Sequence, residues 1–527
     1  MIVADSDALK AAAAPESPLD RRAWVAAHLV IASVGGLLLA YTGYRAHALS
    51  FTHDESLSYL FHVSRSYGSI LLDADTANNH LLNTVLMKLF GAGFGPHPLW
   101  LRLPNLAAHA VYLVFSCLWL RLFARPGVLV AGFLVLNLNP YLLDFFSLAR
   151  GYGLSTGLMM ASVYFMTRTL RSGDLQNLRN LRMEAASLVS AALAVLASYT
   201  LLNVYLALLI VLNVAAVGRY RSSRSDEPIA AFLFRRNLPA GIVSSLLAGL
   251  LFAPLIQLAA GGQLYYGGTQ GFWRDTLASL IDRTLYQPSH AGEAAHALVL
   301  SFVVLIATAS VLSIAKQLRS QLAETLVSPL FASCLLLLLA ALSTVVQHHW
   351  LGTPYLMGRT ALFLVPLFWL MAICLWTTVR ADRPRRLAGV LAGGTALVSL
   401  VHLLASINGS SALDWRYDAT TRQVVDYLEQ QQASSATPTA VGVNWRFAPT
   451  MFFYRETREL PWLQIVENAD THHSELDRRG FGSRMHYYYV LDEDLASIDH
   501  DYRPELRFAE TEVGSGALYR SSSSSPD

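Results

Sequence analysis

The sequence predicts an α-helical polytopic membrane protein that ends in a small soluble α/β domain. Of its 527 residues, 54% are hydrophobic and only 14% are charged, whereas an ordinary soluble domain has roughly 25% charged residues. The mean hydropathy is positive. This composition excludes an intrinsically disordered chain and a soluble globular one. The three cysteines lie inside apolar runs, which excludes a disulfide scaffold and a CxxC zinc site.

Eleven apolar segments are candidate spans, because a helix needs about 20 apolar residues to cross the hydrocarbon. The first is too long, and starts too late, for a cleaved signal peptide, so we expect it to be retained. The fifth and sixth form one run, and the polar patch Ser198, Tyr199, Thr200 and Asn203 predicts a tight turn between them. The segments are 22–46, 104–123, 127–146, 150–171, 184–199, 202–218, 239–260, 294–316, 328–346, 359–380 and 386–407.

Arginine and lysine in the loops predict the orientation, since cytoplasmic loops are enriched in these residues. With the N-terminus in the cytoplasm, 20 Lys and Arg fall on the cytoplasmic side and eight on the other. Every cytoplasmic connection is then basic. An odd number of spans places the C-terminal tail outside, and removing one span would invert every later loop.

The tail is polar enough to form a soluble domain, which we expect over 409–520, after a transmembrane domain over 21–408. It holds 19 Asp and Glu and 11 Lys and Arg. We expect both ends of the chain, 1–20 and 521–527, to be disordered. Within the tail the patterns predict strands at Val441–Asn444 and Tyr487–Leu491, a helix at Phe447–Arg455 and a hairpin at Leu506–Tyr519.

The first outer loop, 47–103, is too long to be a simple connector. It opens with Asp54 and Glu55 directly after the first span. A carboxylate at the membrane surface is costly unless it is solvated or paired. Two adjacent carboxylates can raise one another's pKa and supply a general base. The alternative is a hydrated pair that caps the following helix.

The same loop contains an amphipathic segment, Asn78–Phe90, with apolar residues at helical spacing. It is too short to span and is predicted to lie in the interface. Asn78, Asn79 and His80 cluster at its start. They are either an ordinary N-cap cluster or side chains that converge on Asp54.

Two arginines are predicted at the outer ends of spans. Arg150 lies near Tyr152, and Arg359 follows Tyr355 at the start of the tenth span. A single interfacial arginine often extends towards lipid head groups. Several arginines around one outer site would instead bind phosphate, because guanidinium groups pair well with phosphate oxygens.

The order of these motifs resembles the GT-C membrane glycosyltransferases that use lipid-linked sugars. The likeness is greatest to the branch that holds the protein O-mannosyltransferases and the aminoarabinose transferase of lipid A. It covers about residues 20–410. It is carried by HDES at His53–Ser56 in a long first outer loop, RLPN at Arg102–Asn105, ARGYG at Ala149–Gly153 and the late outer Tyr355–Arg359 segment.

The resemblance implies roles for ten residues. Asp54 would be the catalytic base with Glu55 as its partner, and the donor would be a polyprenyl phosphate that carries one sugar. The donor phosphate would be bound by Arg150, Tyr152, Tyr355 and Arg359. His53, His80, Arg102 and His349 would support the site.

One departure concerns His80: the family has HPP or KPP where this chain has NNHLL. Some relatives bind a divalent metal ion near the acidic pair. Such an ion would find possible ligands in His53, Asp54, Glu55, His80 and His349, although their spacing fixes no site. No other cofactor is implied.

The resemblance therefore predicts a glycosyltransferase of a bacterial inner membrane that transfers one sugar with inversion. Its acceptor would be a lipid, an envelope glycan or a protein on the periplasmic side. The cytoplasmic segments contain no Gly-rich phosphate loop and no DxD motif for a nucleotide sugar. A flippase or transporter, a polymerase of lipid-linked oligosaccharide and a non-catalytic scaffold remain the alternatives. A flippase or transporter would need charged residues within the spans and repeat symmetry between the two halves of the chain.

Overall fold

The computed structural model describes residues 18–73, 76–172, 178–223, 228–286, 292–378, 382–432, 438–467, 485–492, 494, 502–508 and 516–521. The disorder predicted for the two ends falls mainly outside these residues. Two boundaries differ from the prediction: the first helix already begins at Pro18, and the last strand includes Ser521. Proline at the first helical position and Asp20 in the first turn both favour a helix start here.

All eleven predicted segments correspond to helices, so the polytopic helical fold is confirmed. Nine helices in the described part of the chain are long and apolar enough to cross a membrane, and a bent pair makes a tenth. The eleventh segment, α9 (Gly151–Arg171), is long enough but less apolar, and it is mostly buried among the others. The helices are α2 (Pro18–Ala48), α6 (Pro98–Leu120), α7 (Pro126–Asn137) with α8 (Pro140–Phe146), α9 (Gly151–Arg171), α10 (Leu178–Ala197), α11 (Leu202–Ser223), α13 (Leu238–Ala260), α15 (Glu293–Ser320), α17 (Pro329–Leu351), η4 (Gly358–Ala361) with α18 (Leu364–Thr378), and α19 (Asp382–Ser406).

Two features of these helices follow directly from the sequence. The predicted turn between the fifth and sixth segments is confirmed as η2 (Tyr199–Leu201). The pair α7 and α8 is bent by 66°, because Asn139 caps a new helix whose first residue is Pro140.

Helix α9 lies at the centre of the bundle, packed between α6 and α10. Most of its side chains are buried, including small and polar ones. A Cβ on Gly157 would lie 2.6 Å from the carbonyl oxygen of Ala108, so this glycine permits close packing against α6. Because protein surrounds α9 on most sides, the helix can be less apolar than its lipid-facing neighbours.

The first outer loop folds into short helices: α3 (His53–Ser58), η1 (Tyr59–Val63), α4 (Tyr67–Leu72) and α5 (Leu81–Phe94). The predicted amphipathic helix is confirmed as α5, although it begins after the asparagines rather than with them. The remaining short helices are α12 (Ile229–Arg236), η3 (Phe272–Ala278), α14 (Ser279–Leu285) and α16 (Leu322–Leu326).

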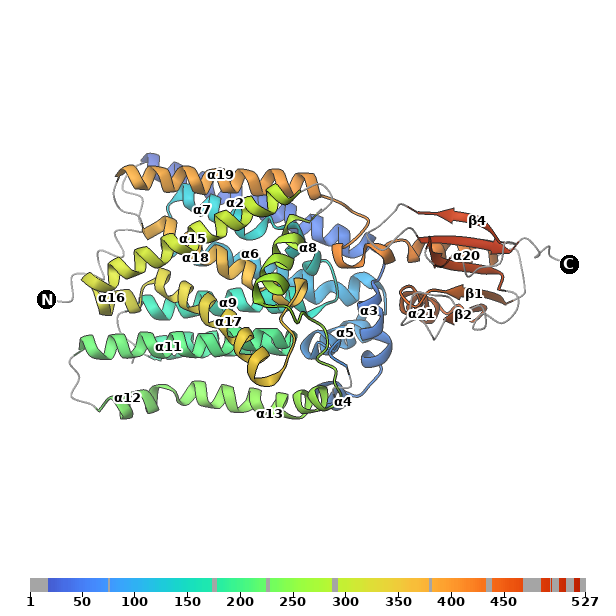
Figure 1. Cartoon of the computed structure of the whole chain (residues 1–527), viewed down its shortest axis with the longest axis horizontal. Helices are drawn as coiled ribbons and strands as arrows, with labels where there is room; N and C mark the ends of the chain where they lie inside the picture. Colours follow the sequence, from blue (N-terminus) through green and yellow to red (C-terminus); the bar gives the residue numbers. More distant parts are fainter. Residues whose placement is uncertain are drawn as a thin grey trace.

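The chain after α19 forms a small α/β domain at one end of the helical body (Figure 1). Its sheet has the strand order β2-β1-β3-β5-β4; β1 is parallel to β2 and β3, and β5 is antiparallel to β3 and β4. The elements are η5 (Leu413–Asp418), α20 (Thr421–Gln432), β1 (Thr439–Val443), α21 (Ala448–Thr457), β2 (Leu463–Glu467), β3 (Tyr487–Leu491), β4 (Tyr502–Arg507) and β5 (Gly516–Ser521).

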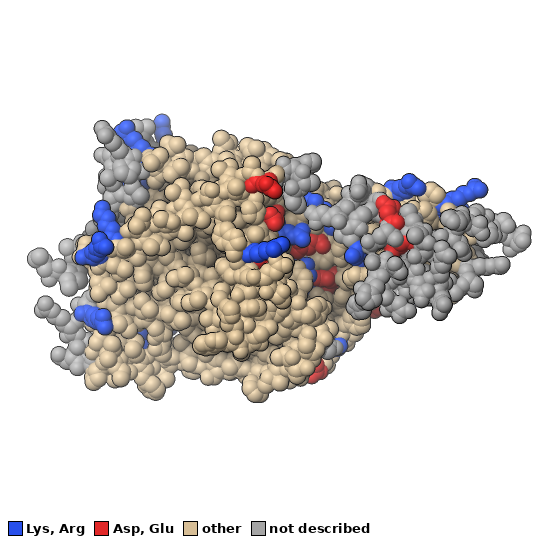
Figure 2. All heavy atoms as spheres, viewed as in Figure 1, with Lys and Arg blue, Asp and Glu red and all other residues tan. Residues whose placement is uncertain are grey.

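The two ends of the helical body differ in what they carry. Figure 1 places α3, α4 and α5 at the end that bears the sheet domain, and α12 and α16 at the opposite end. On the face drawn in Figure 2, charged side chains gather at the two ends, and the long surface between them is almost uncharged. An uncharged band of this kind is what the hydrocarbon of a bilayer requires.

Candidate active site

Asp54 and Glu55 are neighbours on α3, but their carboxylates lie in different surroundings. Thr52 is the N-cap residue of α3, and the Glu55 side chain accepts the backbone N–H of Thr52 at 2.9 Å. This bond of the capping-box motif turns Glu55 back into the loop. Glu55 therefore has the capping position of the predicted alternative, but it is buried rather than hydrated, while Asp54 projects elsewhere.

Glu55 forms a fully buried ion pair with Arg102, at 2.7 Å. Arg102 donates two hydrogen bonds to Glu55 and further bonds to the carbonyl oxygens of Ala46, Leu49 and Ser50. The Ala149 N–H also donates to Glu55. This pair thus ties the end of α2, the first outer loop and the start of α9 together.

Asp54 instead contacts two arginines from distant parts of the chain. Its Oδ2 lies 3.4 Å from Arg150 Nη2 and 3.2 Å from Arg359 Nη2, and its side chain is 15% exposed. Arg150 is the N-cap of α9, and it also donates to the Ser58 hydroxyl at 2.9 Å. Trp415 contributes a further hydrogen bond to the carboxylate.

The arginines keep Asp54 ionised. Burial raises the pKa of Asp54, but the charges of Arg150 and Arg359 lower it by more, leaving it at about 2. Asp54 is therefore a carboxylate at physiological pH. While both arginines hold it, it is also a weak proton acceptor.

The ion pairs continue beyond Arg359. Arg359 Nη1 lies 3.5 Å from Asp414 Oδ2, and Asp414 Oδ1 lies 3.6 Å from Arg283 Nε. Three cations thus alternate with two carboxylates in a chain of charges: Arg150, Asp54, Arg359, Asp414 and Arg283. We call these five residues the charge chain. Its net charge is +1.

Aromatic side chains border the charge chain. The Arg359 guanidinium lies 4.6 Å from the centre of the Tyr266 ring and 5.0 Å from that of Trp415. Tyr141 donates a hydrogen bond to Asp414 at 3.0 Å. Arg150 Nε and Arg359 Nε are buried without a hydrogen-bond partner in the described part of the chain. Unpartnered cationic N–H groups of this kind point to an anionic ligand.

Two of the other predicted residues lie beside the charge chain. Tyr152 packs edge-on against His80, with ring centres 4.8 Å apart, and lies within electrostatic range of Arg359. His80 Nδ1 is 3.0 Å from the carbonyl oxygen of Ala197. Burial and the charge of Arg150 both lower the pKa of His80 well below its usual range, so the ring is neutral.

The remaining three predicted residues, His53, Tyr355 and His349, lie further from the charge chain. His53 Nδ1 is 2.9 Å from the carbonyl oxygen of Arg446 in the sheet domain, and burial lowers its pKa. Tyr355 forms a backbone bridge with Gly268 and stacks on His348 at 4.0 Å. His349 is exposed near the end of α17. Among the described residues, neither Tyr355 nor His349 forms a hydrogen bond, an ion pair or a ring contact with the charge chain.

The residues proposed as metal ligands do not gather in the structure. In the described ranges, no three His, Cys, Asp or Glu side chains are placed to hold a metal ion. Glu55 is occupied by Arg102, and Asp54 faces cations.

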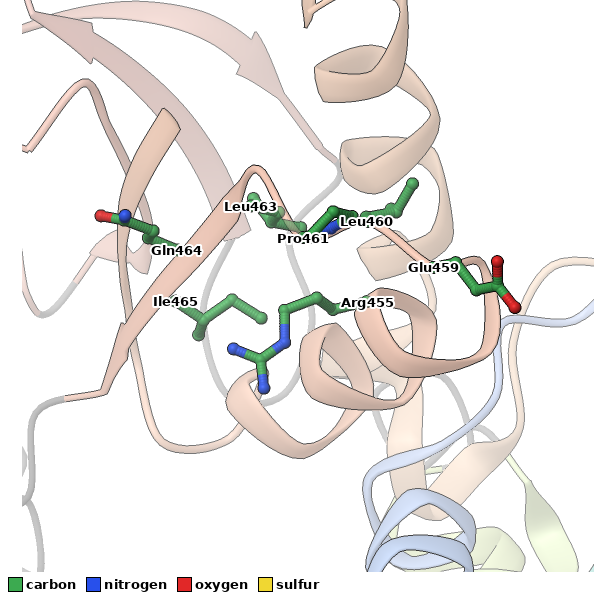
Figure 3. Close-up of a pocket in the computed structure, with 7 residues that line it drawn as sticks. All are labelled: Arg455, Glu459, Leu460, Pro461, Leu463, Gln464 and Ile465. Atoms are coloured by element: carbon green, nitrogen blue, oxygen red, sulfur yellow. The ribbon is translucent and has the colours of Figure 1, made fainter. Parts of the chain in front are cut away.

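A separate cleft of about 700 Å³ lies on the sheet domain, between α21 and β2 (Figure 3). None of its lining residues belongs to the charge chain, and Glu459 points away from the Arg455 guanidinium in this view. The lining consists of Arg455, Glu459, Leu460, Pro461, Leu463, Gln464 and Ile465. The candidate site therefore rests on the charge chain rather than on this cleft.

Sequence reasoning missed four residues of the site: Asp414, Trp415, Arg283 and Tyr266. Asp414 and Trp415 follow the last span almost as closely as Asp54 follows the first. A carboxylate directly outside a span was the signal used for Asp54, and it would have identified Asp414 as well. Arg283 and Tyr266 carry no comparable signal.

Comparisons with known proteins agree with this architecture at the level of the fold. No known family matches the sequence, and no curated protein is significantly similar to it. The crystal structure of ArnT from Cupriavidus metallidurans in the apo state, a GT-C aminoarabinose transferase, is similar with a TM-score of 0.50 and 10% identity. The match covers 95% of this chain and 99% of that one. The structure of ArnT bound to undecaprenyl phosphate matches over the same shares, with a TM-score of 0.47 and 10% identity. The protein thus has the polytopic fold of the GT-C membrane glycosyltransferases, as its sequence predicts.

Proposed function

We propose that this protein is a glycosyltransferase that moves one sugar from a polyprenyl phosphate to an extracytoplasmic acceptor. The acceptor would be a lipid, an envelope glycan or a protein. The observation that carries the proposal is the charge chain: two arginines converge on Asp54 at the end of the body that bears the sheet domain. The fold shared with ArnT supports the same reaction class, by analogy.

The charge chain suits the donor's phosphodiester. A phosphodiester carries a single negative charge, which would balance the net charge of +1. The buried, unpartnered Nε groups of Arg150 and Arg359 would supply hydrogen bonds to its oxygens. Tyr152 lies close enough to assist them. Tyr355, which lies further out, would act through the loop it anchors rather than by direct contact.

Donor binding would also activate Asp54. When the phosphate takes over hydrogen bonds from Arg150 and Arg359, Asp54 loses the cations that keep its pKa at about 2. Its pKa then rises and it becomes a better base. The donor would thus have to bind before the acceptor is deprotonated.

The transfer step balances as a direct displacement. The acceptor oxygen or nitrogen gives its proton to Asp54 and attacks the anomeric carbon. The bond from that carbon to the phosphate oxygen breaks, and polyprenyl phosphate departs with the electron pair. Arg150 and Arg359 stabilise the charge that develops on it. A single displacement inverts the anomeric carbon.

Within this scheme Glu55 and Arg102 support the loop and do not touch the reacting atoms. His53 and His80, both neutral, fix the two sides of the site. If the protein lies in a bacterial inner membrane with its N-terminus in the cytoplasm, the charge chain faces the periplasm.

Mass spectrometry of co-purifying lipids tests the proposal. An Asp54→Asn variant should retain the donor and be unable to use it, so a polyprenyl phosphate with one sugar should be enriched relative to wild type. That lipid would also identify the sugar. A pyrophosphate-linked oligosaccharide would favour a polymerase or flippase instead. Wild-type transfer by Asp54→Asn would refute the base assignment.

A further inference from the structure

The segment that joins α19 to the sheet domain is built into the site. η5 lies between the last span and α20 and supplies Asp414 and Trp415 to the arginine cluster. If this segment only connected the two domains, its side chains would not need fixed positions at the site. The structure instead holds it at several points.

A buried ion pair in the helical body fixes the start of the segment. Arg45 of α2 and Asp144 of α8 lie 2.6 Å apart, with side chains 1% and 2% exposed. Arg45 also donates to the carbonyl oxygen of Ser411, and Asp144 accepts the N–H of Leu413, at 2.7 and 2.8 Å. The backbone directly before Asp414 is therefore held by groups from two helices.

The sheet domain fixes the other end. Asp418 accepts hydrogen bonds from the hydroxyls of Thr421 in α20 and Thr450 in α21, at 2.5 and 2.6 Å. Arg416 donates to the carbonyl oxygen of Tyr286, which follows α14. Asp414 and Trp415 thus occupy fixed positions between the two parts of the molecule.

Asp414 joins three separate elements through one carboxylate. It accepts hydrogen bonds from Tyr141 of α8 and Arg359 of η4, and it forms an ion pair with Arg283 of α14 at 3.6 Å; its side chain is only 6% exposed. A carboxylate between two guanidinium groups fixes the direction of both. Without it, Arg359 would be free to turn fully towards Asp54, its other ionic partner among the described residues.

Trp415 restrains the same arginine. Its ring lies 5.0 Å from the Arg359 guanidinium, and its side chain also hydrogen-bonds to Asp54. One residue therefore contacts both members of the ion pair that the donor phosphate would have to open.

We propose that η5 completes the donor phosphate site, with Asp414 as the positioning residue that holds Arg359 and Arg283 towards the phosphate. This rests on the proposed function. It gives the sheet domain a part in the reaction, because its docking holds the segment that carries Asp414 and Trp415.

The sign of one mutational effect distinguishes positioning from plain charge. Asp414 is negative, so removing its charge should strengthen phosphate binding if only Coulomb attraction mattered. If Asp414 positions the arginines, Asp414→Asn should weaken binding by about tenfold, the equivalent of one charge-assisted hydrogen bond. The two views predict opposite changes.

The measurement is the affinity of the full-length protein in nanodiscs for undecaprenyl phosphate, used as the probe. Asp414→Glu keeps the negative charge, so its affinity should lie within about threefold of the wild-type value. A residue with a merely structural role would not be rescued by this substitution. Asp426→Asn is the matched control: this carboxylate lies in α20, outside the site, and pairs with Arg458 at the end of α21. The affinity of the Asp426→Asn variant for undecaprenyl phosphate should equal that of wild type.

Each outcome is decisive. Equal or tighter binding by Asp414→Asn would overturn the role of Asp414. If that variant does not fold, Tyr141→Phe replaces it, since it removes one hydrogen bond to Asp414 and keeps every charge. Tyr141→Phe should bind about threefold more weakly, and unchanged affinity would contradict the inference. Absence of binding by the wild type would instead refute the lipid-phosphate donor, and with it this inference.

Discussion

Two adjacent carboxylates, Asp54 and Glu55, have separate surroundings. A sequence can identify the pair as unusual, but it cannot show which member reaches a distant arginine. The spacing from Thr52 to Glu55 was a local signal for a capping box, and it assigns Glu55 to the loop. The partners of Asp54 come from α9 and η4, and only the folded chain brings them together.

The buried pair predicts that Glu55 affects stability more than chemistry. Glu55→Gln leaves Arg102 charged and fully buried without an ionic partner, which costs about 3–5 kcal/mol. We expect a lower apparent melting temperature in detergent for Glu55→Gln and little change for Asp54→Asn. If Glu55→Gln kept the wild-type melting temperature but lost transfer, Glu55 would belong to the reacting groups.

The charge of Asp54 predicts a pH dependence. Its pKa of about 2 is below the ordinary value of 3.8. The ion pairs therefore stabilise the folded protein above pH 3.8, and this contribution is lost as the pH falls towards 2. At low donor concentration kcat/KM follows the free enzyme, so wild type should show no loss from Asp54 protonation between pH 8 and 5.

Arg359→Gln is the variant that tests this assignment. It removes one of the two cations that lower the pKa of Asp54, so the acid limb of kcat/KM should move to higher pH. Donor KM should also rise by about tenfold, because a charge-assisted bond to phosphate is lost. An acid limb at the same pH in both proteins would mean that Arg359 does not act on Asp54.

At the scale of elements, periodicity and apolar length were sufficient to predict the eleven long segments of the bundle. They missed α20, whose sequence is mostly polar, β2, which has only five residues, and the short helices α4, α12, α14 and α16. They also missed the bend at Asn139 and Pro140, since α7 and α8 together read as one apolar run. The bend matters for the site because α8 carries Tyr141 and Asp144. Contacts of this kind depend on packing between distant segments, which one sequence does not encode locally.

Gly151 predicts how tightly the start of α9 must pack. A Cβ at this position would lie 1.8 Å from the carbonyl oxygen of Ala197 and 2.7 Å from His80 Nδ1. Gly151→Ala must therefore push α9 away from α10 and displace the neighbouring Arg150. We expect lower thermal stability, by about 1–3 kcal/mol, and weaker binding of undecaprenyl phosphate.

Gly241→Ala is the matched control for Gly151→Ala. Gly241 lies in α13, and a Cβ there meets nothing within 4 Å. Alanine is the better helix former, by about 0.5–1 kcal/mol, so this variant should be as stable as wild type or slightly more so. Equal melting temperatures for the two variants would show that α9 and α10 can separate without cost.

At the scale of the whole molecule, the fold links the number of spans to the side on which the chemistry occurs. The arginine-rich connections and the sheet domain lie at opposite ends of the body, which an odd number of spans requires. The bent pair α7 and α8 acts as one crossing, because Arg150 at the start of α9 contacts Asp54, which follows the first span. The body can be inserted in either of two orientations, and these place the site on opposite sides of the membrane.

Fusions to alkaline phosphatase, which is active only in the periplasm, decide between them in a bacterial host. If the N-terminus is cytoplasmic, fusions after Ser172 and Gln321 should be inactive and a fusion after Ser521 active. The basic connections that precede the first two points favour this outcome. If the body is inserted the other way round, the pattern reverses: the first two fusions become active and the last inactive. The site would then face the cytoplasm, and an extracytoplasmic acceptor would be ruled out.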